Sequence, residues 1–290
     1  MVRKHESQDQ TPADAIDRLR LARAEGVGPV AYRRLLARYG SAAAALDALP
    51  GLARAGGRPV SPAVPSPDDA ARELHTISRL GARMIFAGEP DYPPLLALLD
   101  DAPAALTVLG HPTLLADRAV ALVGGRNASA NGQRMAENLA VDLARSLVVV
   151  SGLARGIDAA AHIGALQSGR TIAAVAGGLD VPYPPEHADL QRRIADSGAV
   201  ITEAPVGTAP QARRFPRRNR IIAGLALGVV VVEAALRSGS LITARLAQEA
   251  GRELFAVPGS PLDPRSRGAR PDPSGCPSHR DSAGRAGQPA

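Results

Sequence analysis

Five arginines surround a single phenylalanine, Phe215, in the stretch QARRFPRRNRIIAG (211–224). No acidic residue occurs between Glu203 and Glu233 to balance their charge. A solvated charged loop usually mixes both signs, so an unmixed cluster favours an anionic ligand. Arginine clamps phosphate oxygens in a bidentate manner, and an aromatic ring offers a face on which a base can stack. We therefore expect a basic phosphate-binding loop that leads into a core helix over IIAGLALG. The arginines are Arg213, Arg214, Arg217, Arg218 and Arg220.

Turns rich in glycine and serine follow the apolar runs in the same part of the chain. Small residues there let backbone amides approach a phosphate, and the N-terminus of a following helix adds partial positive charge. Several such turns on one edge of a sheet predict a groove for a single-stranded nucleic acid better than a reader of duplex DNA. The candidate positions in these turns are Gly124, Gly125, Arg126, Asn127, Ser151, Gly152, Arg155, Gly156, Ser238, Gly239 and Ser240.

The elements that must position these residues are strands alternating with helices. Runs of Val, Ile and Ala that are apolar without interruption indicate strands buried on both faces, as in a parallel sheet covered by helices on each side. The fold class predicted is therefore α/β, with a doubly wound parallel sheet. ARMIF and ALTVLG lead into it, and the main strands are expected at 119–125, 147–152, 171–178, 199–204, 228–234 and 253–259.

A small helical unit is expected to precede this sheet. Residues 12–50 show apolar residues at helical spacing, interrupted at Gly26–Pro29 and at Gly40–Ser41. A tight glycine turn between helices resembles the helix-hairpin-helix or SAM-like modules, some of which grip a nucleic-acid backbone; an ordinary helical packing unit is the alternative. We expect a domain over 1–50 and a Gly/Pro-rich linker over 51–67.

Composition excludes several classes of protein. The chain has 290 residues, a formal charge of +6 and no apolar run long enough to span a membrane. Its first residues lack the apolar core of a secretory signal, so the expected location is the cytoplasm. The single cysteine, Cys276, excludes an internal disulfide and a cysteine-based metal cluster. Lys4 is the only lysine, so the chain has no P-loop lysine for binding ATP.

The motifs also argue against a cofactor or a catalytic site. GGRNAS is not the G-x-G-x-x-G of a dinucleotide site, and the second main strand ends in Ser-Gly rather than an acid for a ribose hydroxyl. Asp158 and His162 have the spacing of a structural pair on a helix. Glu203 and Glu233 end two strands and are expected to orient arginines. We expect no cofactor, no metal and no enzyme activity.

A family resemblance rests on five motifs in order between about 119 and 268. They are VALVGGRNAS, VVVSGLARGIDAAAH, AVAGGLDVPYPPEH, FPRRNRIIAGLALGVVVVEAALRSGSLITARLA and FAVPGSPLDPRSRG. Together they resemble the DNA-processing protein DprA (Smf) family. The resemblance implies an extended Rossmann fold over 68–268, binding of single-stranded DNA, loading of a RecA-type recombinase as in natural transformation, and a homodimer.

The resemblance also implies which residues form the DNA pocket. Its glycine–serine–arginine turn corresponds to Gly124, Gly125 and Arg126, and its F-x-x-R-N-R motif to Phe215, Arg218, Asn219 and Arg220. Gly125 stands where serine or alanine is usual, so one hydroxyl contact to phosphate is expected to be absent. The alternative is a nucleotide-processing enzyme resembling the phosphoribohydrolases, but their P-G-G-x-G-T-x-x-E motif is missing from Arg237–Thr243.

The tail departs from the family pattern. After Leu262 the chain has no Leu, Ile, Val, Met or aromatic residue, so 269–290 is expected to be disordered. When residues 271–281 are reverse-translated and read one base later, the sequence accommodates the I-x-x-G-A segment that the family has after this point. We therefore hypothesise a frameshift.

Overall fold

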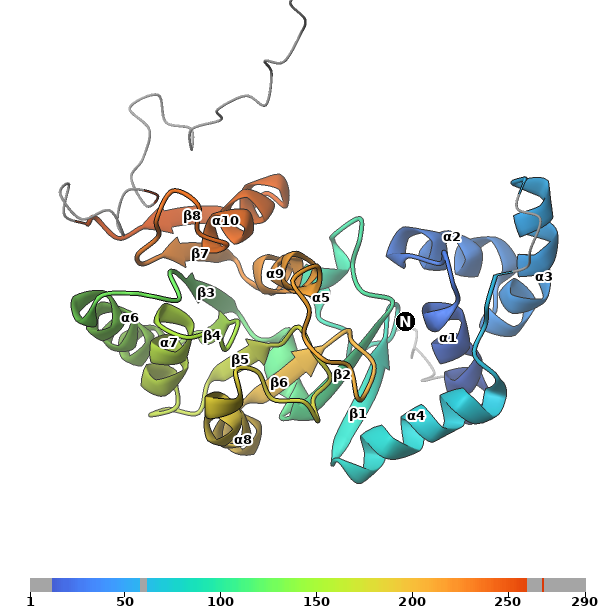
Figure 1. Cartoon of the computed structure of the whole chain (residues 1–290), viewed down its shortest axis with the longest axis horizontal. Helices are drawn as coiled ribbons and strands as arrows, with labels where there is room; N and C mark the ends of the chain where they lie inside the picture. Colours follow the sequence, from blue (N-terminus) through green and yellow to red (C-terminus); the bar gives the residue numbers. More distant parts are fainter. Residues whose placement is uncertain (1–11, 58–61, 260–267, 269–290) are drawn as a thin grey trace, which may run out of the picture.

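The computed structural model describes residues 12–57, 62–259 and 268. Figure 1 shows a group of N-terminal helices (blue) beside a larger α/β body that contains one sheet. The helices are α1 (Pro12–Arg23), α2 (Pro29–Tyr39), α3 (Ala42–Ala55), α4 (Pro67–Arg79), α5 (Pro94–Ala97), α6 (Ala130–Leu143), α7 (Ile157–Ala165), α8 (Ala188–Ser197), α9 (Arg214–Leu225) and α10 (Ser240–Glu249), with short 3-10 turns at Pro112–Ala116 and Pro185–His187. The strands are β1 (Ala82–Phe86), β2 (Ala105–Gly110), β3 (Ala119–Val123), β4 (Val148–Ser151), β5 (Thr171–Ala174), β6 (Ala199–Thr202), β7 (Gly228–Val231) and β8 (Glu253–Ala256).

The two predicted breaks in the N-terminal unit are confirmed. Pro29 begins α2, where its missing N–H leaves no hydrogen bond unmade. Gly40 ends that helix at φ 77°, and the Ser41 hydroxyl then caps α3 by accepting a bond from Ala44 N. The segment that was expected to begin a linker at residue 51 is still helical, because α3 continues through Pro50 to Ala55. The proposed domain boundaries stay a prediction.

The eight strands form one sheet in the order β1-β2-β6-β5-β4-β3-β7-β8. Strands β3 to β8 pair in parallel, which confirms the predicted α/β class. The two leading strands differ, because β1 pairs antiparallel with β2 and β2 pairs antiparallel with β6. An antiparallel edge on an otherwise parallel sheet is a common arrangement in α/β proteins.

Helices cover both faces of the sheet, which explains the uninterrupted apolar strands. Helices α6, α7 and α8 pack on one face, and α9 and α10 pack on the other. Neighbouring residues in β3 serve different cores: Ala121 and Val123 face α9, while Leu122 packs with α6 and α7. The order reverses at β3, because β4 lies on one side of it and β7 on the other. Such a switch point opens a crevice at the carboxyl ends of the strands.

The basic loop predicted over 211–220 is wrong in part, because α9 already begins at Arg214. Pro216 lies in the first turn of α9, where proline is tolerated. The predicted core helix is confirmed for its first turns, since Ile221, Ile222 and Leu225 are buried. The arginines are therefore presented at helical spacing rather than on an extended loop.

Strand β8 forms one edge of the sheet, and its Phe255 is 53% exposed. The predicted disordered tail at 269–290 and the frameshift hypothesis lie outside the described residues. Within 12–57 and 62–259, every helix is too short or too polar to cross a bilayer.

Candidate functional site

An open cleft of about 880 Å³ lies at the carboxyl ends of β3, β4 and β7. Its walls come from the turn after β3, the first turns of α9, and the turn before α10. Pockets for small ligands usually measure about 300–1,000 Å³. The cleft lies at the upper end of this range, and it opens at the β3 switch point of the sheet.

The turn after β3 supplies Gly124, Gly125, Arg126 and Asn127, all of which line the cleft. A Cβ on Gly124 would lie 2.4 Å from Ile157 Cγ1, so only glycine fits there. A Cβ on Gly125 would lie 3.5 Å from the Glu233 carbonyl oxygen, which is ordinary contact. Gly125 N donates to that same oxygen over 2.6 Å, so this amide is already used inside the protein.

The turn after β4 packs beneath the cleft, and its residues mostly bond or pack within the protein. Ser151 is fully buried, and its hydroxyl donates to the Leu122 carbonyl over 2.6 Å. Gly156, at φ 73°, packs where a Cβ would lie 2.4 Å from the Gly125 carbonyl oxygen. Gly152 lies beneath the guanidinium of Arg218. Arg155 is exposed and forms an ion pair with Glu186.

Phe215 lies between two arginines at the first turn of α9. The guanidinium carbon of Arg126 is 4.7 Å from the centre of the Phe215 ring, and that of Arg218 is 5.9 Å away. The Tyr183 ring lies 5.7 Å from Phe215, tilted by 52°. Two cations and two aromatic faces thus meet at one end of the cleft, which suits phosphate groups together with bases.

Arg218 is a buried cation held from below. Its Nη1 donates to the carbonyl oxygens of Gly152 and Ala174, the latter over 2.7 Å. Burial lowers the pKa of Arg218 to about 10, although the carboxylate of Asp158 raises it and Arg126 lowers it further. Arg218 therefore stays charged at neutral pH and lines the cleft in a fixed position.

The other residues of the arginine cluster face elsewhere. Arg220 is 8% exposed and forms ion pairs with Glu203 and Asp101, so the expectation of an unneutralised cluster is wrong for this residue. Arg217 is exposed but does not line the cleft. Asn219 lines the cleft and donates to the Gly239 carbonyl over 3.3 Å, which joins α9 to the turn before α10.

The turn before α10 completes the opposite wall. Ser238, Gly239 and Ser240 all line the cleft, and the two serine hydroxyls lie 2.7 Å apart. A Cβ on Gly239 would meet nothing within 4 Å, so this turn is open to an approaching ligand.

The acidic residues of the site have other roles than predicted. Glu203 pairs with an arginine as expected, but Glu233 instead accepts bonds from Ser129 N and Ser129 Oγ, over 2.9 and 2.6 Å. Asp158 and His162 do not pair with each other. Asp158 accepts a bond from Ala154 N, and burial raises its pKa. His162 Nδ1 instead lies 2.8 Å from Thr171 Oγ1.

Sequence reasoning left Tyr183 and Pro210 out of the candidate set, although both line the cleft. Tyr183 is 44% exposed beside Phe215, in a chain with only four tyrosines. An aromatic residue in the segment after the Gly177-Gly178 turn was the feature of the sequence that could have indicated Tyr183. Among the described residues, no group of three or more His, Cys, Asp or Glu could hold a metal ion.

Known proteins match this chain over most of its described length. The model of the DNA recombination-mediator protein A family matches residues 83–271, and that of the DprA-like N-terminal HHH domain matches 12–76. The chain is 49% identical over 178 residues to DNA processing protein DprA of Streptococcus pneumoniae, covering 61% of this chain and 63% of that protein. It is 47% identical over 188 residues to Protein Smf of Escherichia coli, covering 64% of this chain and 50% of that protein. The chain thus spans about half to two thirds of these relatives' length.

Solved structures agree with the sequence matches. The X-ray structure of DprA from Streptococcus pneumoniae superimposes with a TM-score of 0.66 at 43% identity, covering 71% of each chain. DprA from Helicobacter pylori, described for its single-stranded DNA binding mode, superimposes with a TM-score of 0.58 at 31% identity, covering 63% of this chain and 83% of that one. With a family model matching residues 83–271 and the same fold in two solved relatives, this chain belongs to the DprA (Smf) family of DNA recombination-mediator proteins.

Proposed function

We propose that this chain binds single-stranded DNA in the cleft and acts as a recombination mediator without enzyme activity. The observation that carries the proposal is the position of Phe215 between Arg126 and Arg218 at the cleft wall. Arginine binds phosphate through its fixed fork of donors, while an aromatic face accepts a stacked base of any sequence. Both groups are accessible together only to a strand whose bases are not paired.

The glycine turns support binding to a backbone rather than to a small nucleotide. Gly239 is open to approach, Asn127 is exposed, and both lie in the same cleft as Arg126. The cleft, about 880 Å³ in volume, is open rather than enclosed, which suits a strand that continues beyond it. The candidate contacts are Gly124, Gly125, Arg126, Asn127, Gly152, Arg155, Phe215, Arg218, Asn219, Ser238, Gly239 and Ser240, with Ser151, Gly156 and Arg220 supporting them from within the protein. Arg217 is exposed outside the cleft, so it would contact only a strand that extends beyond it.

A binding role without catalysis fits the state of the carboxylates in the cleft. Glu233 is occupied by two donors from Ser129, and Asp158 is buried beneath the cleft with an amide donor. Neither carboxylate has a histidine beside it, since the nearby His162 faces Thr171. Glu233 and Asp158 are therefore poorly placed to act as general acid and base on a bound nucleotide.

We further propose that this chain loads a RecA-type recombinase and forms a dimer, as its resemblance to the family implies. The Helicobacter pylori relative is described as binding single-stranded DNA, and the matching family model is named for recombination mediation. These names support DNA binding and recombination mediation, and the loading and dimer proposals need their own tests. A filament-nucleation assay on single-stranded DNA coated with a single-strand binding protein tests loading, and light scattering tests the dimer.

The binding proposal is tested by fluorescence anisotropy with labelled single-stranded and double-stranded oligonucleotides of the same sequence. The expected result is tighter binding of the single strand, with affinity that falls as salt rises. Equal affinity for the two forms would contradict the proposed mode. Incubation with nucleoside monophosphates, followed by chromatography for free base, checks the enzyme alternative, and release of base above a no-protein control would contradict the non-enzymatic role.

A further inference from the structure

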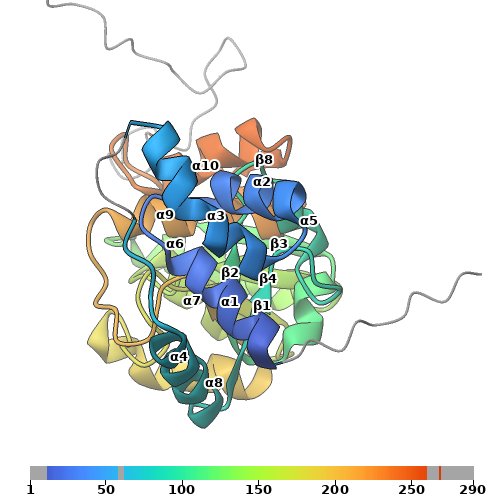
Figure 2. The same cartoon turned by 90° about the vertical axis from the view of Figure 1, so that its right-hand side faces the viewer.

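The N-terminal helices contact the α/β body at the strand end that leads to α9. Figure 2 shows α1 and α4 in front of the sheet, where α4 packs on both α1 and β1. Arg23, the last residue of α1, is bound on both sides of this contact. Its Nη2 donates to Glu73 Oε1 of α4 over 2.8 Å, and its Nη1 donates to the Glu203 carbonyl oxygen over 3.1 Å.

Glu203 connects this contact to the helix that carries the site. It follows β6 directly, and its carboxylate pairs with Arg220 of α9. Arg220 is two residues from Arg218 and five from Phe215, which contribute a cation and a ring to the cleft. Glu203 is therefore held by the N-terminal unit through its carbonyl, while its side chain holds α9.

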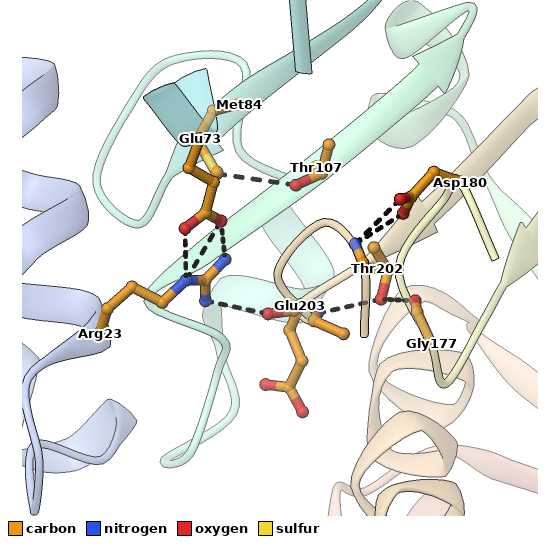
Figure 3. Close-up of polar contacts among 10 residues, drawn as sticks. Arg23, Glu73, Met84, Thr107, Gly177, Asp180, Thr202 and Glu203 are labelled. Atoms are coloured by element: carbon orange, nitrogen blue, oxygen red, sulfur yellow. Dashed lines mark hydrogen bonds and ion pairs between the residues drawn. The ribbon is translucent and has the colours of Figure 1, made fainter. Parts of the chain in front are cut away.

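The connection from β6 to α9 is tethered further along its course. Figure 3 shows Thr202, whose hydroxyl donates to the Gly177 carbonyl and accepts from Ala204 N, over 2.9 and 3.0 Å. Both Asp180 carboxylate oxygens accept from Gly207 N. Downstream of these tethers the connection supplies Pro210 to the cleft wall. Of these tethers on the β6–α9 connection, the Arg23–Glu203 hydrogen bond is the one made by the N-terminal helices.

We infer that Arg23 is a positioning residue, which couples the N-terminal helical unit to the DNA cleft by fixing Glu203 and, through it, α9. The inference rests on the proposed DNA-binding function. Arg23 itself does not line the cleft, so it acts through α9 rather than on the ligand. Its loss should loosen 203–225 and weaken DNA binding while the number of phosphate contacts stays the same.

The chain offers matched variants for this test. Arg23→Lys keeps the charge, but a single ammonium cannot reproduce the fork that spans Glu73 and Glu203. Arg23→Gln removes the charge as well. Arg20→Gln is the control, because Arg20 lies one turn earlier on α1 and, among the described residues, bonds to Asp17 and the Pro65 carbonyl instead of to Glu203. Circular dichroism first confirms that each variant is folded.

The first readout needs no DNA. Hydrogen–deuterium exchange of the full chain, followed by mass spectrometry, should show faster exchange over 203–225 in both Arg23 variants and not in Arg20→Gln. Exchange that rises only within α1 and α4 would overturn the inference. This measurement needs no ligand, so it tests the coupling between Arg23 and α9 even if the unaltered chain does not bind DNA. Failure of the unaltered chain to bind DNA would contradict the proposed function and leave the coupling intact.

The second readout is the single-stranded DNA titration at several salt concentrations. Both Arg23 variants should raise Kd about three- to ten-fold, the range of one hydrogen bond's net worth, with the slope of log K against log salt unchanged. Arg20→Gln should bind as the unaltered chain does. A Kd in Arg23→Lys equal to that of the unaltered chain would overturn the coupling to DNA binding.

Discussion

The guanidinium of Arg126 lies 4.7 Å from the centre of the Phe215 ring, so the turn after β3 meets the first turn of α9 across the cleft. The two residues are far apart in the sequence, because Arg126 follows β3 and Phe215 lies on α9, between β6 and β7. Their contact places a cation and a stacking face at the same position, which is the arrangement that an unpaired nucleotide needs.

Replacing Phe215 with leucine should weaken single-stranded DNA binding by about 1–3 kcal/mol, the usual worth of one stacked base. Leucine keeps the apolar contact with Tyr183 but removes the aromatic face. Phe255→Leu is the matched control, because Phe255 is also exposed but lies on β8 away from the cleft. An equal Kd for Phe215→Leu and the unaltered chain in anisotropy titrations would mean that no base stacks there.

Replacing Arg220 with alanine should reduce the free energy of unfolding by about 2–4 kcal/mol, because it leaves the half-buried Glu203 carboxylate without its partner. The salt dependence of DNA binding should stay unchanged, since Arg220 faces Glu203 and Asp101 rather than the cleft. Urea denaturation measures the first quantity and titration at several salt concentrations the second. A flattened salt slope would show instead that Arg220 contacts phosphate.

Gly125→Ser should fold as the unaltered chain does, because a Cβ there makes only ordinary contact with Glu233. Because Gly125 lines the cleft, the added hydroxyl should tighten DNA binding about three-fold, the net worth of one hydrogen bond. Gly124→Ala is the contrasting variant, because its Cβ would overlap Ile157, and it should cost about 1–3 kcal/mol of stability. Weaker binding by a stable Gly125→Ser would contradict the inferred approach of phosphate to this turn.

Acid stability should depend on His162. Burial lowers the pKa of His162 to about 3, with Arg218 and His187 adding to the effect. Between that value and about 6.5, the ordinary pKa of histidine, the unfolded chain binds a proton that the folded chain does not. Stability should therefore fall as pH drops through this range, by up to about 1.4 kcal/mol per pH unit.

His162→Asn isolates this contribution, because asparagine can still bond to Thr171 but does not titrate. Asp158, whose raised pKa acts in the opposite direction, is present in both proteins. The difference in unfolding free energy between them should thus change steadily between pH 6.5 and pH 4. Parallel curves for the two proteins would contradict the buried, neutral state of His162.

The strands and the position of the cleft could be predicted because they depend on local pattern. Uninterrupted apolar runs such as Val148–Val150 specify strands buried on both faces, and small residues at their carboxyl ends mark the turns. The state of the arginines could not be predicted in the same way. Arg220 is neutralised by Asp101, which is distant in sequence, and the clustering of charge along the chain does not reveal that contact.

The same limit applies to Tyr183 and to Glu233. Tyr183 reaches Phe215 only because the segment after β5 folds over the cleft, and Glu233 bonds to Ser129 only because β3 and β7 are neighbours. Both contacts depend on the order of strands in the sheet. Residue spacing identified the turns, but tertiary structure decided which side chains line the cleft and which support the turns from below.

Binding of phosphate in the cleft is tested by the salt dependence of single-stranded DNA binding by Arg126→Ala. Arg126 is exposed at the cleft, so its removal should take away one phosphate contact and reduce the slope of log K against log salt by about 0.7. Arg134→Ala is the matched control, because Arg134 is an exposed arginine on α6 that does not line the cleft. We expect a flatter slope for Arg126→Ala and an unaltered one for Arg134→Ala. Identical slopes for the two variants would contradict a phosphate-binding cleft at this edge of the sheet.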